Sequence, residues 1–165
     1  MIRLLVLVAL LCLPAPALTQ PGNSRWHQQT ATPQSLPLEP LVIDSGDQRH
    51  RFQVEVARTR GQRTIGLMFR DHLPADRGML FDNGRVMPTS FWMRNTYIPL
   101  DMVFVHADGR IESIAKETTP LSDRPVHSGA PVRAVLELQG GLADTLGLQP
   151  GDLVRHEMFG NLDRE

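Results

Sequence analysis

The sequence contains a single cysteine, Cys12, among 165 residues. This cysteine lies in an apolar run near the amino terminus, Leu4 to Leu13, so the rest of the chain has no thiol. Disulfide bonds, thiol catalysis and zinc sites with cysteine ligands are therefore excluded beyond that run. A domain formed by this chain must be held together by its hydrophobic core, and 41% of the residues are hydrophobic, which is enough for one compact domain.

Neither sign of charge is in excess. Lysine and arginine total 17, aspartate and glutamate total 18, and the formal net charge is −1. Sequence-independent affinity for nucleic acid or for an anionic membrane surface depends on a surplus of positive charge. The composition therefore gives no electrostatic argument for a nucleic-acid partner or for binding at a membrane surface.

Long hydrophobic runs are also lacking. The run from Leu4 to Leu13 is much shorter than the roughly 20 apolar residues that span a bilayer. It follows Arg3 and precedes Ala15-Pro16-Ala17, which together form the three parts of a secretory signal peptide. We expect residues 1–17 to be removed on export. The mature protein is then periplasmic or secreted and has no transmembrane segment.

The segment after this leader lacks hydrophobic periodicity. Residues 18–38 are rich in proline, glutamine, serine and threonine, a composition typical of a flexible linker. We predict a single domain at residues 39–159 and a short carboxyl-terminal tail at residues 160–165.

Familiar catalytic and cofactor signatures are absent. The chain has no G-x-S-x-G, no G-x-x-x-x-G-K, no dinucleotide fingerprint and no H-E-x-x-H. Its six histidines share no short spacing of the kind that metal ligands have. We therefore predict neither a cofactor nor a metal site built on histidine.

What the chain does contain is a series of short segments with the period of two that β-strands require. Phe52, Val54 and Val56 alternate with polar residues, the pattern of a half-buried strand. Further strand segments are predicted at residues 41–44, 78–82, 100–106, 110–118, 133–138 and 153–157. The predicted fold class is all-β with one or two short helices, arranged as an antiparallel β-sandwich or a squashed barrel.

A short helix is predicted after the second strand. Thr59 and Gln62 have the spacing of a capping box, which predicts a helix from Arg60 to Phe69. Its apolar face would bury Ile65, Met68 and Phe69. Arg63 and Arg70 share another face, either as solvated charges or as contacts for an anion.

Asp108-Gly109 predicts a hairpin between residues 100–106 and 110–118. A two-residue turn places Asp101 opposite Lys116, as a cross-strand ion pair. A three-residue turn with a glycine bulge shifts the register by one residue and removes that pair. Both registers remain open at this point.

The segment Phe91 to Asp101, FWMRNTYIPLD, is the strongest candidate for a binding site. Consecutive aromatic residues beside an Arg-Asn-Thr cluster are typical of a pocket wall. The alternative is a buried strand end whose polar residues satisfy their own backbone. The predicted ligand-binding residues are Trp92, Arg94, Asn95, Thr96, Asp101, Arg70 and Glu137.

Two further chemistries fit the residue types present. Asp101 and Glu137 each interrupt an apolar strand, so they are candidates for the paired carboxylates of a hydrolase, or else outward-facing or ion-paired structural residues. Five methionines lie within 35 residues, and thioethers are ligands for Cu(I) as well as adaptable core fillers. Of these five, Met87 and Met93 are the least well explained by packing.

The motifs together resemble one protein family. FWMRNTYIPLD, GLMFR at 66–70, GMLF at 78–81, LDMVFVHADGRI at 100–111, LEL at 136–138 and GD at 151–152 are similar to the motifs of the family called domain of unknown function 192. This resemblance covers roughly residues 54–154. It implies a small β-rich, sandwich-like fold, and it implies no activity.

The functional prediction therefore rests on the residues and not on the family resemblance. The sequence favours an exported protein that binds a small polar ligand or a polar part of an envelope polymer. The alternatives are a metal-independent hydrolase that uses Asp101 and Glu137, and a copper-binding protein that uses its methionines.

Export can be tested by intact-mass measurement of protein from the cell envelope. We expect a mass that corresponds to cleavage near Ala17 and an unmodified chain thereafter, because the leader has all three parts of a cleavable signal. A retained Met1, or a lipid mass on Cys12, would contradict this expectation.

Overall fold

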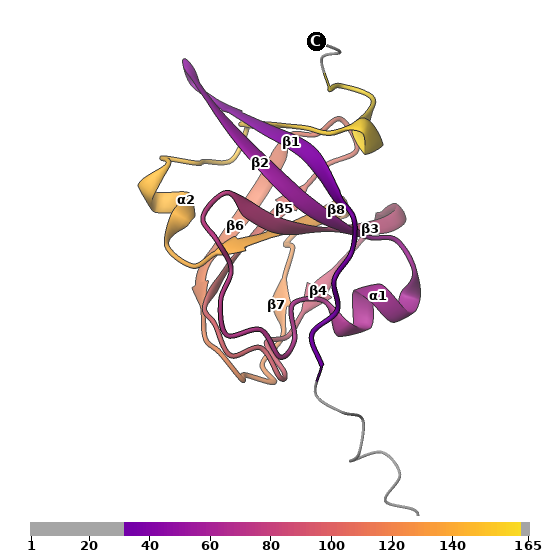
Figure 1. Cartoon of the computed structure of the whole chain (residues 1–165). Helices are drawn as coiled ribbons and strands as arrows, with labels where there is room; N and C mark the ends of the chain where they lie inside the picture. Colours follow the sequence, from indigo (N-terminus) through magenta and orange to yellow (C-terminus); the bar gives the residue numbers. More distant parts are fainter. Residues whose placement is uncertain (1–31, 163–165) are drawn as a thin grey trace, which may run out of the picture. The chain divides into compact units, whose positions relative to one another are not determined.

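Seven β-strands form one sheet in the part of the chain that the structure, a computed structural model, describes, residues 32–162 (Figure 1). The strands of the sheet are β1 (Leu38–Ser45), β2 (Gln48–Ala57), β3 (Arg77–Met87), β5 (Leu100–Val105), β6 (Ile111–Thr118), β8 (Val132–Gln139) and β9 (Leu153–Arg155). Two short strands, β4 (Ser90–Phe91) and β7 (Val126–His127), pair separately. The helices are α1 (Arg60–Ile65) and α2 (Leu142–Thr145), with a 3-10 turn at Glu157–Phe159. The predicted signal peptide and most of the predicted linker lie outside the described residues.

The strands lie in the order β6-β5-β8-β3-β2-β1-β9, and every neighbouring pair except β2–β3 is antiparallel. The chain between β2 and β3 passes through α1 and a loop, and this crossover makes the two strands parallel. The all-β prediction with short helices is confirmed. None of the helices within residues 32–162 has the length and apolar character that crossing a membrane requires.

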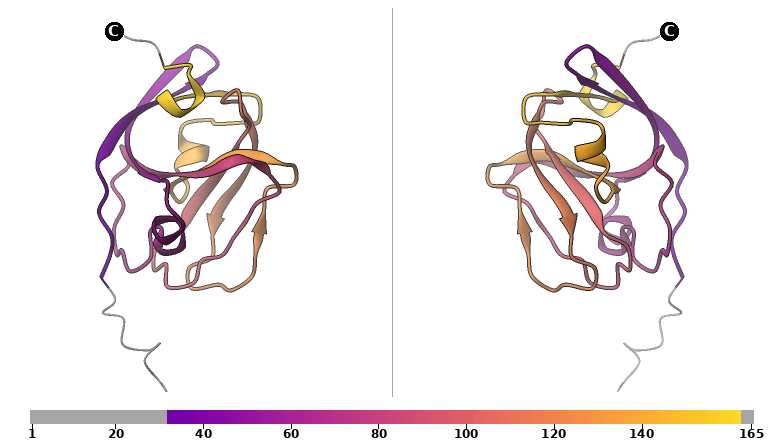
Figure 2. Two further views of the ribbon diagram at one scale, coloured as in Figure 1. Left: turned by 90° about the vertical axis from the view of Figure 1, so that its right-hand side faces the viewer. Right: turned by 90° about the vertical axis from the view of Figure 1, so that its left-hand side faces the viewer.

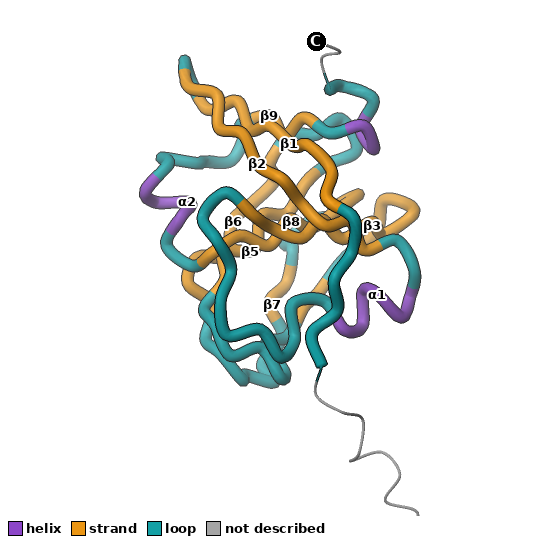
Figure 3. Tube along the Cα trace, viewed as in Figure 1, coloured by secondary structure: helices purple, strands orange, loops and turns teal. Residues whose placement is uncertain are grey.

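The sheet curls into a partial barrel (Figures 2 and 3). The curl is closed by β9, which bonds to β1 and also to the turn between β5 and β6. On one side β9 pairs with β1. On the other side the Val154 N–H donates to the Gly109 carbonyl at 2.7 Å, and the Ile111 N–H donates to the Asp152 carbonyl at 2.8 Å. These bonds close one end of the curl. The ribbon of β4 and β7 lies with α1 toward the opposite end (Figure 1).

Strand β8 has buried side chains on both of its faces. Ala134, Leu136 and Leu138 pack into one apolar cluster, with Val54 and Val103. The residues between them face a second apolar cluster, which includes Met79, Phe81, Met102, Phe104 and Val135. The buried apolar residues of β8 are therefore divided between the two clusters, because side chains alternate along a strand.

The predicted helix is shorter than the sequence pattern indicates. Its capping box is present as predicted, since the Gln62 N–H donates to the Thr59 hydroxyl and the Gln62 side chain accepts from the Thr59 N–H. The helix ends at Gly66, however, where φ is +50°, and the chain leaves the helical path there. The expectation that Ile65, Met68 and Phe69 form a buried helical face is therefore wrong: α1 buries none of its own residues.

The hairpin of β5 and β6 has a three-residue turn. The His106 N–H donates to the Arg110 carbonyl at 2.9 Å, and Gly109 adopts φ +91°. Val105 then lies opposite Ile111. A register shift between Val105 and Phe104 follows, and beyond it Val103 lies opposite Ile114, as the two-residue turn would also place it. A second irregularity, between Leu100 and Met102, leaves Asp101 without a cross-strand partner on β6.

The ion pair between Asp101 and Lys116, which the two-residue turn would give, is consequently not formed. The Asp101 carboxylate is fully buried and accepts three backbone N–H groups, from Glu117 at 2.7 Å, Gly141 at 3.0 Å and Ala143 at 2.7 Å. Lys116 instead pairs with Asp144 at the surface. Asp101 therefore ties the second irregularity of β6 to the start of α2.

We expect Asp101→Asn to destabilise the domain by about 3 kcal/mol or more, because buried hydrogen bonds to a charged acceptor are worth roughly 1.5–3 kcal/mol each. Lys116→Met should cost less than about 1 kcal/mol, as exposed pairs do. Urea unfolding of both variants and of the double mutant measures these effects. A coupling energy well above about 0.5 kcal/mol between the two positions would contradict the arrangement described here.

Candidate functional site

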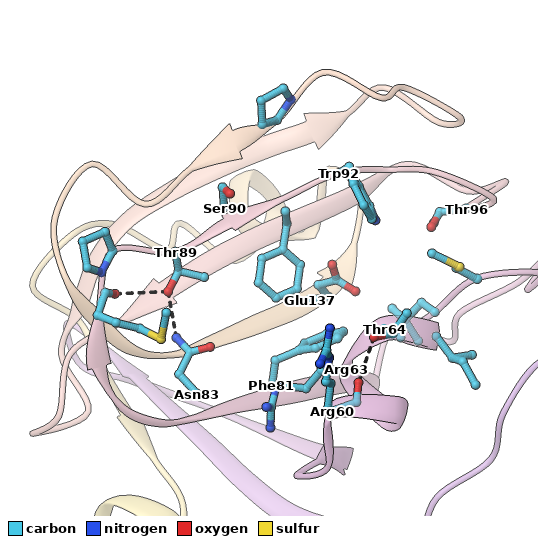
Figure 4. A pocket seen from close by; sticks show the side chains of 18 residues that line it. Arg60, Arg63, Thr64, Phe81, Asn83, Thr89, Ser90, Trp92, Thr96 and Glu137 are labelled. Carbon is cyan, nitrogen blue, oxygen red and sulfur yellow. Dashed lines mark hydrogen bonds between the residues drawn. The ribbon is translucent and has the colours of Figure 1, made fainter.

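A cavity of about 500 Å³ lies between α1 and the ribbon of β4 and β7 (Figure 4). Residues 60 and 63–68, which belong to α1 and to the turn after it, form one wall. Residues 81, 83 and 87–92 form a second wall. Thr96, Pro125 and Glu137 complete the lining. Figure 4 shows the Glu137 carboxyl group in the middle of the cavity, with Trp92 on one side and Arg60 and Arg63 on the other.

Close packing of two phenylalanines shapes the apolar part of the cavity. The rings of Phe81 and Phe91 meet edge to face, with centroids 4.9 Å apart, a preferred geometry for aromatic pairs. The Phe81 ring also lies 3.0 Å from the place that a Cβ of Gly66 would occupy. Only glycine fits there without a shift of the ring, and the glycine ends α1 at the cavity wall.

Glu137 supplies an unpaired carboxyl group to this apolar lining. The residue is 4% exposed, and no hydrogen bond or ion pair reaches its carboxyl group from any residue between 32 and 162. Burial raises the pKa of Glu137 from its ordinary value of 4.5 to about 8. At neutral pH the group is therefore mainly a neutral carboxylic acid, which can donate one hydrogen bond.

Two arginines of α1 are the other charged residues that line the cavity. The Nη1 atom of Arg63 donates to the carbonyls of Arg58 and Asp82, the latter at 3.0 Å, and this holds the guanidinium group in place. The Nε and Nη2 atoms of Arg63 have no hydrogen-bond partner among the described residues. Arg60 is exposed. The cavity thus combines cationic donors with a neutral acid.

Trp92 has a cationic neighbour on one face of its ring. The Arg94 guanidinium carbon lies 4.4 Å from the centre of the indole ring, a cation–π contact, and Arg94 Nε donates to Asp123 at 2.7 Å. Trp92 is 48% exposed and lines the cavity. Arg94 therefore contacts a wall residue and is not part of the lining.

The structure brings together only some of the predicted site residues. Trp92, Thr96 and Glu137 line the cavity, whereas Asn95 lies beside it, where its carbonyl accepts the Phe69 N–H at 2.8 Å. Asn95 adopts φ +56°, a backbone conformation that asparagine tolerates better than most residues. Its role in the described structure is to shape the loop between the wall segments.

Arg70 lies away from the cavity. It forms an ion pair with Glu55 at 2.8 Å and donates to the Gln34 carbonyl at 2.6 Å. The Leu36 N–H also donates to Glu55, at 2.7 Å. This group fastens residues 34–36, the end of the predicted linker, to the sheet.

The two candidate catalytic carboxylates lie on opposite faces of the sheet. Asp101 pairs with Leu138 across β5 and β8, and Glu137 pairs with Met102. Paired residues point to the same face and neighbours along a strand point to opposite faces, so the two side chains are separated by the sheet itself. The arrangement of two carboxylates flanking one bond, which the hydrolase prediction requires, is not present.

The five methionines divide between the interior and the cavity lining. Met79, Met93 and Met102 are buried, and Thr118 donates to the Met93 sulfur at 3.2 Å. Met68 and Met87 line the cavity. Within residues 32–162 there is also no group of three or more His, Cys, Asp or Glu side chains arranged to hold a metal ion.

Several lining residues were not predicted as part of a site, among them Arg60, Phe81, Asn83, Thr89 and Ser90. For Arg63, the sequence left an anion contact open as one of two alternatives. The others come from segments that the sequence pattern marks only as a helix start, a strand and a loop. Their meeting depends on how α1 packs beside β3, which local patterns do not encode.

Both the sequence and the fold have counterparts among known proteins. The model of a family named DUF192, described as "Uncharacterized ACR", matches residues 41–156. A crystal structure of a candidate transcription regulator from Sinorhizobium meliloti 1021 is 39% identical with a TM-score of 0.74, over 76% of this chain and 98% of that one. A protein of unknown function from Novosphingobium aromaticivorans DSM 12444 is 42% identical with a TM-score of 0.71, over 73% of this chain and 86% of that one. No curated protein matches the chain.

The raised pKa of Glu137 predicts a stability that depends on pH. In the unfolded chain Glu137 loses its proton near its ordinary pKa of 4.5, whereas in the folded protein it keeps the proton up to about pH 8. The stabilising effect of the proton is therefore fully present below the lower value and is lost as pH rises to the higher one. Glu137→Gln does not titrate, so it should be more stable than the wild type by on the order of 3 kcal/mol at about pH 7.

Urea unfolding across a pH series measures this difference, with Asp71→Asn as a control because Asp71 is exposed. We expect the advantage of Glu137→Gln to shrink as the pH falls toward the ordinary pKa of glutamate. An advantage that is absent, or that stays the same at every pH, would contradict the burial of an unpaired carboxyl group.

Proposed function

The chain belongs to the domain of unknown function 192 family, matched over residues 41–156, and from its cavity we propose that it is an exported protein that binds a small polar ligand or a polar part of an envelope polymer. The amino-terminal signal pattern supports export to the periplasm or the exterior. The cavity is the binding site. Its volume of about 500 Å³ suits a single ring-sized molecule or one unit of a polymer.

The unpaired carboxyl group of Glu137 is the observation that carries this proposal. A buried polar group without a partner costs free energy, by about 1–3 kcal/mol in proteins, so such groups are rare unless something else satisfies them. Here the group lies in a cavity that a ligand can enter. A ligand with a hydrogen-bond acceptor would give the carboxylic acid the partner that the described residues do not supply.

Binding is favoured over the two alternatives by the placement of the side chains. Asp101 is on the far face of the sheet from Glu137 and is occupied by three backbone N–H groups, so the cavity has one carboxyl group and no second one. Of the five methionines in question, two line the cavity. A hydrolase needs a second acid–base group, and a copper site needs several converging thioethers.

The description of the Sinorhizobium meliloti protein as a candidate regulator of transcription does not alter this proposal. A protein that binds DNA directly needs cationic groups to neutralise phosphates. The present chain has a formal net charge of −1. The composition therefore gives no electrostatic argument for DNA binding, whereas the cavity supports a small-molecule ligand.

The proposal is tested with Trp92 as the reporter. The chain has two tryptophans, so Trp26→Phe leaves Trp92 as the only indole. This variant is titrated with glucose, N-acetylglucosamine, glucuronate, benzoate, glucosamine, benzylamine, inorganic phosphate and Cu(I). We expect at least one organic compound to change the Trp92 fluorescence saturably and to raise the melting temperature, because ligands that bind only the folded state stabilise it.

Matched variants show whether the response comes from the cavity. Trp92→Ala removes a half-exposed wall residue, and Tyr97→Ala removes a half-exposed ring from the same loop that does not line the cavity. We expect the rise in melting temperature to be lost in the first variant and kept in the second. A panel without any response, or a response lost equally in both variants, would overturn the proposal. A saturable response to Cu(I) alone would favour the copper alternative.

A further inference from the structure

We propose that the ligand carries a carboxylate, seated between Arg63 and Glu137, on a ring that stacks against Trp92. This inference rests on the proposed function and names the chemical class of its ligand. The class is a small cyclic organic acid, which includes sugar acids and aromatic acids.

The charges that line the cavity favour an anion. Arg60 and Arg63 come from α1, and Glu137 comes from β8. The lining residues from β3, from β4 with its flanking residues, and from the loops at Thr96 and Pro125 are all uncharged. With Glu137 protonated, the lining has two positive charges and no negative one. A cationic ligand would meet repulsion there, and an anionic ligand would be attracted.

Arg63 is prepared to bind a planar anion. Its Nη1 atom is already fixed by the carbonyls of Arg58 and Asp82, so the side chain does not have to be ordered when a ligand binds. The Nε and Nη2 atoms lie on one edge of the guanidinium group and lack partners among residues 32–162. Two parallel N–H donors on one edge match the two oxygens of a carboxylate.

Glu137 distinguishes a carboxylate from other acceptors. As a neutral acid it donates an O–H group, and a charged oxygen is the strongest acceptor for that donor. When Glu137 ionises it becomes a second anion in the same apolar cavity and repels the ligand. The proton on Glu137 therefore acts as a condition for binding, and affinity should fall when that proton is lost.

The presence of Trp92 in the lining is the reason for proposing that the ligand contains a ring. The Arg94 guanidinium lies over one face of the indole ring, 4.4 Å from its centre, and Arg94 also pairs with Asp123 at the surface, while the indole itself lines the cavity. Aromatic and sugar rings both stack on an indole face. The Phe91 ring also lines the cavity, which leaves space for a ring between apolar surfaces and the polar groups of α1 and β8.

The experiment compares acids with amides of nearly the same shape. Isothermal titration calorimetry measures the Kd of benzoate against benzamide and of glucuronate against glucuronamide, with the full mature chain. At about pH 6 we expect at least one acid to bind about tenfold or more tightly than its amide, since a charge-assisted hydrogen bond gains roughly 1.4 kcal/mol over a neutral one. The aromatic pair and the saccharide pair distinguish the two sources of such a ligand.

Variants assign the effect to the cavity. Arg63→Gln and Arg60→Gln should each reduce the preference for the acid, whereas Arg85→Gln should leave it unchanged because Arg85 is exposed and lies outside the lining. The wild-type preference should fall severalfold between about pH 6 and about pH 9, because Glu137 ionises in that interval while the arginines and the ligand acids keep their charges. In Glu137→Gln the preference should be the same at both pH values.

The outcomes separate this inference from the proposed function. If an amide binds as tightly as its acid, or if a neutral or cationic compound of the earlier panel binds through Trp92 while the acids do not, the carboxylate inference is overturned and the binding function stands. If no compound binds, both are overturned. An acid preference that survives Arg63→Gln and Arg60→Gln at full size would also overturn the inference, because the anion would then be held elsewhere.

Discussion

Strand β8, which is covered on both faces, is the element on which the organisation of this domain depends. Strand β8 lies between β5 and β3, and its side chains enter two separate apolar clusters. Glu137 faces the cluster that contains Phe81 and Phe91, and no described residue satisfies its carboxyl group. The low polarity of that environment keeps the proton on the group and raises its pKa to about 8. The remaining access to it is through the cavity beside α1.

Asp101 shows what the same fold does with a carboxylate that serves structure. It is more deeply buried than Glu137, yet three backbone N–H groups surround it, at an irregularity of β6 and at the start of α2. Hydrogen bonds of this kind compensate a buried carboxyl group for the loss of its contacts with water. Two acids one sheet thickness apart therefore have opposite roles. One organises backbone that would otherwise lack partners, and the other presents an unused donor to a space that a ligand can fill.

The position of the cavity depends on how the curled sheet is closed. Hydrogen bonds from β9 to β1 and to the β5–β6 turn join the sides of the curl at one end. The other end carries α1 and the ribbon of β4 and β7, and these elements leave a cavity between them (Figures 1 and 4). Arg94, which contacts the Trp92 ring, pairs with Asp123 and so links the segment after β4 to the loop before β7 at the surface. The solved structures at 39% and 42% identity share this fold.

The sequence by itself determined the features that depend on neighbours along the chain. The capping box at Thr59 and Gln62, the alternation along β2 and the all-β class could be predicted from the sequence, because each rests on local spacing. Only the tertiary structure decided which acid faces the cavity. Asp101 and Glu137 look alike in sequence, each a single acid within an apolar strand. Their pairing across β5 and β8 is offset by one residue, and since side chains alternate along a strand, that offset puts them on opposite faces of the sheet. Register of this kind is set by turns, bulges and packing between distant segments, which no local pattern records.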